Sequence, residues 1–577
     1  MVKKKESKTD LETLRHSAAH VLAHAIKELY PTAKNTIGPA VEEGFYYDFE
    51  DLHITPEDFK KIERKMKEIV KKNYPFEKKE VTLAELKKMF KDNPYKIEMA
   101  EEFKKAGDKL TIYKSGDFVD LCRGPHVEST GKIKAFKLIK IAGAYWRGDQ
   151  KNKQLTRVYG IAFPSKEELK EYVTKMQEAA KRDHRKIGKE LDLFSFHDCA
   201  PGMPFWHPKG TIIWNELIKY WREEHDKAGY GEIRTPIILS KCLWEQSGHW
   251  KHFRENMYFT KIDEADYAVK PMNCPGGIQV YKNTVRSYKE FPLRHAELGL
   301  VHRHELSGVL SGLFRVRSFT QDDAHIYCTD DKQLKEEIKG VIILTDKIYK
   351  QFNFDYHVEL STMPAKAMGT KDQWVKAEKA LADAMKELKK EYKLNPGDGA
   401  FYGPKLDFHL KDALGRTWQC GTLQLDFQLP IQFDLKYMGE DGTQNHKPTM
   451  LHRTIYGSIE RFIGVLLEHT AGKLPLWCSP IQVRVLTVAD RFDDYAKKVV
   501  KQMKDAGIRA ELDAKTESIS KKVRDAQLQQ INYILVVGER EVKDKTVAVR
   551  TRDNKVHGAK KVDSFIKELV KEIQERI

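Results

Sequence analysis

Three arginines and a glutamate flank one short turn in the segment VHRHELSGVLSGLFRVRSFTQDDAH, residues 301–325. Arg303 and Glu305 precede a Gly- and Ser-rich turn, and Arg315 and Arg317 follow it. Residues at i and i+2 of a strand point to the same side, so an antiparallel hairpin would place each pair on one face. Guanidinium groups bind phosphate oxygens in pairs, and a carboxylate accepts hydrogen bonds from an exocyclic amine. The pattern predicts either a site for a polyphosphate and a purine or a surface hairpin with solvated charges.

The length and composition of the chain indicate what kind of protein contains this segment. A chain of 577 residues is long enough for three or four domains. Its 101 Lys and Arg against 85 Asp and Glu give a net charge of +16, which favours a polyanionic partner such as RNA or DNA. The seven scattered cysteines form no C-x-x-C pair, which favours a reducing compartment and free thiols or metal ligands. Because the sequence has neither a signal-peptide core nor a run of 18 apolar residues, we expect a soluble cytoplasmic protein that does not span a membrane.

Hydrophobic periodicity predicts the elements of the first third of the chain. Helices are expected at residues 10–30, 56–72 and 83–92, and several strands at 109–160. A charged helix at about 165–190 then leads into a stretch rich in Pro and Gly, which indicates a domain boundary.

In the remaining two thirds of the chain, the pattern of expected helices and strands changes near residue 480. Before that point, a long amphipathic helix from residue 210 runs into a strand-like segment that contains Pro236, which suggests an edge strand or an interface. Further helices are expected at 331–351, 371–391 and 456–471, and strands near 401–410 and 416–430. From 480 the order strand, helix, strand, helix, strand predicts a small α/β domain.

Several separated blocks are the most distinctive part of the sequence. They read KPMNCPGG (270–277), RSFTQDDAHIYC (317–328), FYGPKLDF (401–408), WQCGTLQLDF (418–427) and MLHRTIYGSIERF (450–462). The helix and strand ending at Pro236, the hairpin at 301–325 and GSIERF at 457–462 are similar to motifs 1, 2 and 3 of class II aminoacyl-tRNA synthetases. Together these blocks resemble the threonyl-tRNA synthetase family over nearly the whole chain.

The resemblance implies a multidomain α+β fold. Its expected parts are an N-terminal α+β editing domain at 1–165, a linker helix at 166–190, a class II catalytic domain with an antiparallel sheet flanked by helices at 191–475, and a C-terminal α/β anticodon-binding domain at 476–577. Many members carry a ubiquitin-like domain ahead of the editing domain, which is not expected here because few residues precede His16.

The implied function is the ligation of L-threonine to tRNA(Thr) through a threonyl-adenylate, with ATP and Mg²⁺, and the hydrolytic editing of Ser-tRNA(Thr). No residue is assigned as a Mg²⁺ ligand. A homodimer is expected because motif 1, including Pro236, forms the family's interface.

Cys274, His325 and His452 match the three zinc ligands of the family. Three protein ligands leave open positions on zinc for a substrate. With seven Cys and 21 His in the chain, spacing alone would suggest unrelated residues, so this ligand set rests on the resemblance. Asp323 matches a residue that accepts a hydrogen bond from the threonine hydroxyl. A site that binds a hydroxyl rejects valine by about 10⁴ or more, so serine is the expected error.

The resemblance also assigns residues to the reaction itself. The resemblance implies catalytic roles for Arg303, Arg315, Arg461, His249 and Lys405. Contacts to threonine or the phosphates are expected from Asp323, Gln321, Tyr402 and Gln424, and contacts to ATP from Glu305, Phe319, Gln419, Thr422 and Ser458. The arginines would stabilise the charge that builds on the phosphate oxygens, and His249 would assist proton transfer to the tRNA. The alternative for each polar residue is ordinary strand-surface chemistry.

A second group of residues lies in the N-terminal third. His16 and His20 are one helical turn apart, and Cys122 and His126 repeat the same spacing. The four residues could bind zinc, as a similar set does in free-standing alanyl-tRNA editing proteins. In the threonyl family the corresponding pocket is a metal-free hydrolytic site, which we favour over a metal site or a purely structural histidine cluster. The resemblance adds two residues to this editing set, Lys96 and Asp120.

Glu541 and Arg550 match the family's anticodon-reading positions, where such side chains hydrogen-bond to base edges. The chain departs from the family pattern at four positions: Gly277, His304, Leu306 and Thr516. None of these is a predicted ligand or catalytic arginine.

Two other interpretations of the chain are a non-catalytic tRNA-binding regulatory paralogue and a nucleic-acid-binding protein explained by its basic charge. The presence of Arg303, Arg315, Arg461 and the zinc ligands favours an active synthetase over both.

Overall fold

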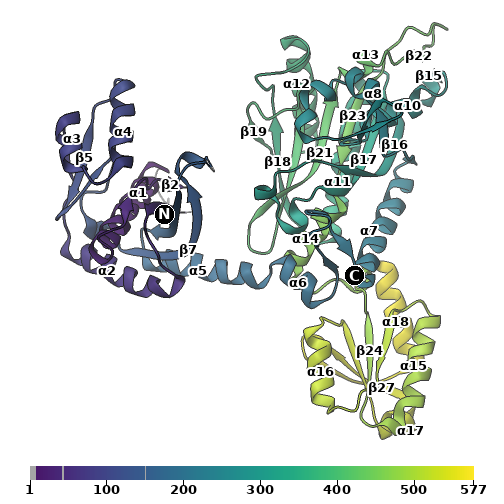
Figure 1. Cartoon of the computed structure of the whole chain (residues 1–577). Helices are drawn as coiled ribbons and strands as arrows, with labels where there is room; N and C mark the ends of the chain where they lie inside the picture. The colour runs from purple at the N-terminus through teal and green to yellow at the C-terminus, as the bar shows by residue number, and fades with distance from the viewer. Residues whose placement is uncertain (1–7, 42–43, 150) are drawn as a thin grey trace. The chain divides into compact units, whose positions relative to one another are not determined.

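The computed structural model describes residues 8–41, 44–149 and 151–577, and the chain divides into two compact units, Met1–Gln177 and Glu178–Ile577. Figure 1 shows the elements of both units. No helix in the described ranges is long and apolar enough to cross a membrane.

The first unit is built around helix α1 (Lys8–Leu29), as its apolar spacing predicts. Ala18, Val21, Leu22 and Ala25 are fully buried along one side of the helix, which contacts strands β3 and β8 and helix α2. The five-stranded sheet beside it consists of β1 (Lys34–Asn35), β2 (Ala40–Val41), β3 (Gly44–Glu50), β7 (Ala135–Tyr145) and β8 (Gln154–Phe163). The predicted second helix is observed as α2 (Phe59–Lys72).

A smaller sheet completes this unit. It contains β4 (Glu77–Glu80), β5 (Thr111–Ser115) and β6 (Phe118–Leu121), beside the predicted helix α3 (Leu83–Met89). Helix α4 (Pro94–Lys105) was not predicted from periodicity. Its start nevertheless has a local signal, because the Asn93 side chain accepts the Lys96 N–H at the cap and proline occupies the first helical position.

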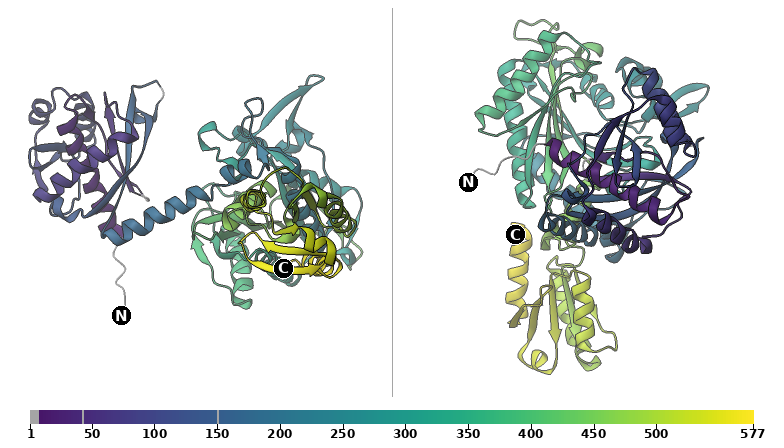
Figure 2. Two further views of the ribbon diagram at one scale, coloured as in Figure 1. Left: turned by 90° about the horizontal axis from the view of Figure 1, so that it is seen from below. Right: turned by 90° about the vertical axis from the view of Figure 1, so that its left-hand side faces the viewer.

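The predicted single linker helix is wrong, because two helices occupy these residues. A long helix, α5 (Lys166–Lys181; Figure 2, left), is followed by a separate short one, α6 (His184–Glu190). The Asp183 carboxylate accepts the Arg185 N–H at 2.8 Å, so this aspartate caps α6 and starts a new helix.

An eight-stranded, mainly antiparallel sheet forms the centre of the second unit. In spatial order its strands are β11 (Gly231–Glu232), β16 (Leu293–His302), β17 (Ser318–Cys328), β23 (Thr449–Thr454), β21 (Thr417–Asp426), β20 (Lys405–Lys411), β18 (Asp355–Ser361) and β19 (Lys393–Asn395). The predicted strands near 401–410 and 416–430 correspond to β20 and β21.

Long helices complete the core of this unit. They are α7 (Pro208–Lys227), α11 (Asp331–Gln351), α12 (Lys371–Glu387) and α14 (Ile459–Thr470), all close to the predicted ranges, and the short α10 (Cys274–Lys282). Helices α11 and α14 contact β17 and β21, and their apolar residues join those of the sheet in one core.

The arginine-rich segment differs from the predicted hairpin at its tip. Strands β16 and β17 pair only from Leu293↔Tyr327 to His302↔Ser318. Residues 303–317 form a connection with two short 3₁₀ turns, Ser307–Val309 and Gly312–Phe314. The arginines therefore lie beyond the strands, and the predicted alternation of faces does not apply to them.

Pro236 also lies outside any strand, in an irregular segment between β11 and β12 (Ile238–Ser240). The prediction of a strand through this proline is wrong, although the neighbouring Ile237 and Ile238 are exposed apolar residues.

The C-terminal residues form the predicted α/β fold (Figure 2, right). Its strands, in spatial order, are β25 (Ala510–Asp513), β24 (Val483–Thr487), β26 (Tyr533–Val537), β27 (Thr546–Thr551) and β28 (Val556–Lys561). The first three are parallel and the last two antiparallel. Four helices accompany them: α15 (Asp493–Asp505), α16 (Ile519–Leu528), α17 (Glu539–Asp544) and α18 (Val562–Glu575).

Candidate active site and editing site

A cavity of about 380 Å³ opens on the central sheet beside the β16–β17 connection. Most of the residues predicted for the reaction line it: Cys274, Arg303, Glu305, Arg315, Phe319, Gln321, Asp323, Tyr402, Gln419, Thr422, Gln424, His452, Ser458 and Arg461. The fold thus brings together residues that are far apart in the sequence. Three predicted residues are not in the cavity wall: His249, His325 and Lys405.

The arginines of the cavity are held in different ways. The Arg303 side chain donates to Pro271 O at 3.2 Å and stacks on the Phe319 ring, and burial lowers its pKa from the ordinary arginine value. Arg461 donates to two main-chain oxygens of the wall, Phe314 O and Gln419 O, both at 2.9 Å. Each bond fixes the direction of a guanidinium group while leaving other N–H groups for a ligand.

Arg315 and Arg317 do not act as a pair. Arg315 is half-exposed in the cavity wall, with its Nε 3.5 Å from a Glu305 carboxylate oxygen. Arg317 instead donates to Glu305 O at 2.8 Å, Pro201 O at 3.3 Å and Ser307 Oγ at 3.3 Å. The prediction of one shared face is therefore wrong: one arginine lines the cavity and the other anchors the connection.

Cys274 and His452 of the cavity wall converge with the buried His325, and the potential ligand atoms of the three lie within 4.8 Å of one another. Cys274 begins α10, and His325 lies directly opposite His452 on the paired strands β17 and β23. His325 is buried, and neither of its ring nitrogens has a hydrogen-bond partner. An unpaired buried polar group is costly, so these nitrogens fit a metal ion better than an apolar core. His452 Nε2 lies 2.8 Å from Asp426, the kind of carboxylate contact that orients a ligand histidine.

The wall beside this trio is polar. Asp323 accepts a hydrogen bond from Asn273 Nδ2 at 3.2 Å, and burial raises the pKa of Asp323 to about 6. Tyr402 donates to Gln424 at 2.8 Å. These contacts hold carboxylate, phenol and amide groups in fixed positions within reach of a small polar ligand.

Two of the residues outside the wall lie just behind it. His249 is fully buried, with Nε2 at 2.9 Å from the sulfur of the cavity residue Met272. Burial lowers the pKa of His249 to about 3, so its ring is neutral near pH 7. Lys405 forms an ion pair with Asp407, and Asp407 accepts hydrogen bonds from the cavity residues Gln419 and Thr422 at 2.7 and 3.0 Å.

Several wall residues were not predicted from the sequence, among them Met272, Leu313, Phe314, Cys420, Arg453 and Gly457. Phe314 has its ring 4.1 Å from that of Trp418 and accepts from Arg461 through its carbonyl, but an apolar residue in a loop gives no sequence signal for this role. Arg453 follows His452 in the block MLHRTIYG, so the sequence contained a signal that could have identified it as a wall residue.

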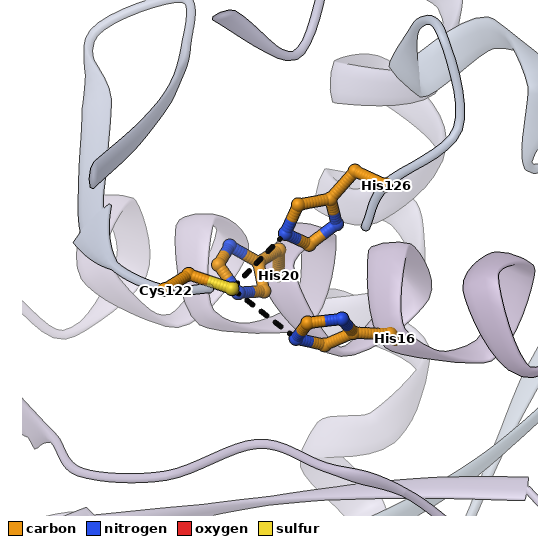
Figure 3. A group of neighbouring side chains, drawn as sticks. All are labelled: His16, His20, Cys122 and His126. Carbon is orange, nitrogen blue, oxygen red and sulfur yellow. Dashed lines mark hydrogen bonds between the residues drawn. The ribbon is translucent and has the colours of Figure 1, made fainter. Parts of the chain in front are cut away.

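In the first unit, His16, His20, Cys122 and His126 form one cluster, with ligand atoms within 4.8 Å (Figure 3). The Cys122 sulfur lies 3.4 Å from His16 Nε2 and 3.3 Å from His126 Nε2. His16 Nδ1 donates to Pro125 O at 3.2 Å, which leaves its Nε2 free to accept. Burial lowers the pKa of His16, His20 and His126 and raises that of Cys122 to about 12, so the cluster is neutral near pH 7.

The predicted Lys96 and Asp120 lie beside this cluster as a buried ion pair, with Lys96 Nζ 2.6 Å from the carboxylate. Asp120 also accepts hydrogen bonds from Tyr47 and from Asn35. His20 Nε2 lies 3.9 Å from Asp120. All six predicted editing residues are therefore found in one place.

The predicted anticodon residues both lie in the C-terminal α/β fold. Glu541 is in α17, where its carboxylate accepts the Gly538 N–H at 3.0 Å, and Arg550 on β27 donates to Asn554 at 3.2 Å. Thr516, one of the departures, is exposed in the segment between β25 and α16.

The chain combines an eight-stranded, mainly antiparallel sheet with a cavity lined by Arg303, Arg315, Arg461, Cys274 and His452, and an α/β domain follows. This combination defines a class II aminoacyl-tRNA synthetase. Residues 258–470 match the tRNA synthetase class II core domain (G, H, P, S and T). Residues 482–573 match the anticodon binding domain, and residues 110–159 match the threonyl and alanyl tRNA synthetase second additional domain. The chain is 56% identical over 567 residues to a threonine–tRNA ligase of Clostridium botulinum (strain Kyoto), covering 98% of this chain and 89% of the relative. It belongs to the threonine–tRNA ligase family, a family of ATP-dependent ligases.

Other relatives agree with this assignment. The threonine–tRNA ligase of Carboxydothermus hydrogenoformans is 56% identical over 568 residues, 98% of this chain and 89% of the relative. A crystal structure of the RNA binding domain of threonyl-tRNA synthetase from Cryptosporidium parvum superposes with a TM-score of 0.66 at 44% identity, covering 67% of this chain and 98% of that one.

Proposed function

We propose that the chain ligates L-threonine to tRNA(Thr) in two steps, through a threonyl-adenylate formed from ATP with Mg²⁺, and that it hydrolyses mischarged Ser-tRNA(Thr). One observation carries the ligase proposal: Arg303, Arg315 and Arg461 meet Cys274 and His452 in a single cavity. Threonine-dependent exchange between ATP and pyrophosphate tests it. Folded, zinc-loaded protein that catalyses no exchange would contradict the proposal and favour a regulatory paralogue.

The phosphate end of the cavity would bind ATP. The α-phosphate is assigned to Arg303, and the terminal phosphate to Arg315 and Arg461, because fixed positive charges stabilise the negative charge that builds during attack by the threonine carboxylate. The adenine is assigned to the space between Arg461 and Phe319, with Glu305 accepting from its amino group. Gln419, Thr422 and Ser458 would contact the adenylate from the same wall.

Cys274, His325 and His452 would hold one zinc ion, which the unpaired ring nitrogens of buried His325 support. When bound, zinc would act as a Lewis acid with open positions for the amino group and hydroxyl of threonine. Asp323 would accept a hydrogen bond from the hydroxyl, while Gln321, Tyr402 and Gln424 would line the remainder of this pocket. Valine lacks the hydroxyl and would leave Asp323 unpaired, whereas serine retains it and would be accepted.

In the second step, His249 would assist removal of a proton from the terminal hydroxyl of the tRNA. Its ring is neutral near pH 7, as a base must be before it accepts a proton, but the burial that lowers its pKa also makes it a weak base. Met272 lies between His249 and the cavity. Lys405 would act through Asp407, which orients Gln419 and Thr422 in the wall.

The cluster of His16, His20, Cys122 and His126, with Lys96 and Asp120, would hydrolyse the ester of Ser-tRNA(Thr). The neutral ring nitrogens would position a water molecule, and the Lys96 ammonium supplies a fixed positive charge beside it. We favour this metal-free arrangement. Metal analysis tests it: a second equivalent of zinc that disappears in His20→Ala would establish a metal site instead.

The remaining roles concern partners. Glu541 and Arg550 would contact anticodon bases, and Thr516 would lack the base contact of an asparagine. A homodimer is proposed through the segment around Pro236, where Ile237 and Ile238 are exposed. A cytoplasmic location is also proposed, because the tRNA substrate would be charged there.

A further inference from the structure

A separate group of potential metal ligands lies on the polar face of the central sheet, outside the cavity wall. It consists of His357 and Glu359 on β18 and His409 on β20. His357 and Glu359 are two residues apart in one strand and so share a face, and His357 is directly opposite His409 in the antiparallel pair. Strand register therefore fixes all three side chains on one surface.

The spacing of these side chains suits a tetrahedral ion. His357 Nε2 lies 3.1 Å from one Glu359 oxygen, and His409 Nε2 lies 3.6 Å from the other. Two ligands at about 2.0–2.1 Å from zinc in a tetrahedral arrangement are about 3.3–3.4 Å apart, which falls between these two distances. The two imidazole rings stack with centroids 4.9 Å apart and an interplanar angle of 14°, so their planes are nearly parallel.

The surroundings of the three side chains leave them accessible to a metal ion and orient the carboxylate. The three side chains are 20–23% exposed, so solvent reaches them. Asn395 donates to Glu359 Oε2 at 3.3 Å and orients the carboxylate. Asp407, directly opposite Glu359 in the same strand pair, is already paired with Lys405.

We propose that His357, Glu359 and His409 form a second divalent-metal site, distinct from the cysteine-containing clusters. Two imidazoles and one carboxylate select zinc, cobalt or nickel over magnesium or calcium, and water would complete the coordination. The ion would join β18 to β20. The same polar face continues to Asp407, which binds the cavity residues Gln419 and Thr422.

Equilibrium dialysis of the full-length chain against Zn²⁺, followed by metal analysis, tests the proposal. The double variant His357→Ala/His409→Ala is expected to bind one equivalent less than the wild type. His446→Ala is the matched control, because His446 also contacts a carboxylate, Asp441, but belongs to none of the metal-ligand groups among the described residues. It is expected to bind as much zinc as the wild type.

Cobalt distinguishes this site from the two clusters that contain cysteine. Cobalt bound to cysteine gives a sulfur-to-metal charge-transfer absorption, so the double variant should lose one cobalt equivalent without losing that absorption. Glu359→Gln is the second test, which remains informative if the double variant is less stable. It should keep the strand pairing and the histidine stack and weaken the binding of the same metal equivalent at least tenfold. Unchanged metal content in both variants, or a lost equivalent that carries the sulfur absorption, would overturn the proposal.

Discussion

The buried imidazole of His184 links Glu468 to the main chain of the arginine-bearing connection. Its Nδ1 lies 2.7 Å from the Glu468 carboxylate, and its Nε2 accepts the Leu313 N–H at 2.9 Å. Because Nε2 must accept, the ring is the neutral tautomer with its proton on Nδ1. The Phe314 ring, 4.2 Å from that of His184, lies in the cavity wall. A residue at the start of α6 thus positions part of the proposed ATP site.

Replacing His184 should weaken ATP binding selectively. In His184→Ala, the Leu313 N–H loses its partner and Phe314 loses its support, which corresponds to about 1–3 kcal/mol, or roughly a 5- to 150-fold rise in KM for ATP. The KM for threonine should remain unchanged, since Asp323 and the Cys/His trio do not contact His184. ATP–pyrophosphate exchange measures both values. Arg185→Ala, which alters the exposed neighbour, serves as control, and an equal rise in both KM values would refute the positioning role.

Glu460 should make folding stability depend on pH. Its carboxylate is buried and accepts the Thr320 N–H at 3.0 Å, and burial raises its pKa from 4.5 to about 8. The folded state therefore binds a proton that the unfolded state releases above about pH 4.5, so this stabilisation is present at low pH and is lost as pH rises towards 8. Relative to Glu460→Gln, the wild type should lose up to about 1.4 kcal/mol of unfolding free energy per pH unit in this window. Denaturant unfolding at several pH values measures the difference; parallel profiles for the two proteins would exclude the effect.

Asp323 should control the choice between threonine and valine. Asp323→Ala removes the acceptor proposed for the substrate hydroxyl, so kcat/KM for threonine activation should fall by about 10² or more while that for valine changes little. Asp323→Asn keeps an oxygen acceptor and should retain more discrimination. Exchange assays with both amino acids measure the ratio, and an unaltered ratio in Asp323→Ala would place the hydroxyl elsewhere.

Variants of the buried pair Lys96 and Asp120 should distinguish a loss of stability from a loss of editing. Lys96→Met leaves Asp120 as an uncompensated buried charge, which should cost about 3–5 kcal/mol and abolish hydrolysis of Ser-tRNA(Thr). Adding Asp120→Asn should restore most of the stability without restoring hydrolysis. Thermal unfolding and deacylation of Ser-tRNA(Thr) are the measurements. Hydrolysis that returns with stability in the double variant would make the pair structural only.

Sequence patterns identified residues whose neighbours along the chain form distinctive blocks. Asp323 and Arg461 belong to such blocks and Arg303 to the segment 301–325, and all three line the cavity. The long helices were also predictable, because the apolar spacing of α1 or α11 is a local property.

Contacts between distant residues could not be predicted in the same way. His184 and Leu313 are 129 residues apart, and neither has a type or spacing that suggests their hydrogen bond. The 303–317 connection reads as strand, but its conformation is determined by tertiary bonds such as that from Arg317 to Pro201 O. The break between α5 and α6 likewise depends on a single cap, Asp183, within a charged stretch that otherwise favours helix.

The anchoring of Arg317 has a consequence for sequence variation. Two of its bonds end on main-chain oxygens, Glu305 O and Pro201 O, which any residue at those positions would supply. His304 and Leu306, the residues before and after Glu305, are both exposed, and Leu306 is 70% exposed. Substitutions on either side of Glu305 should therefore leave Arg303 and Arg315 in place.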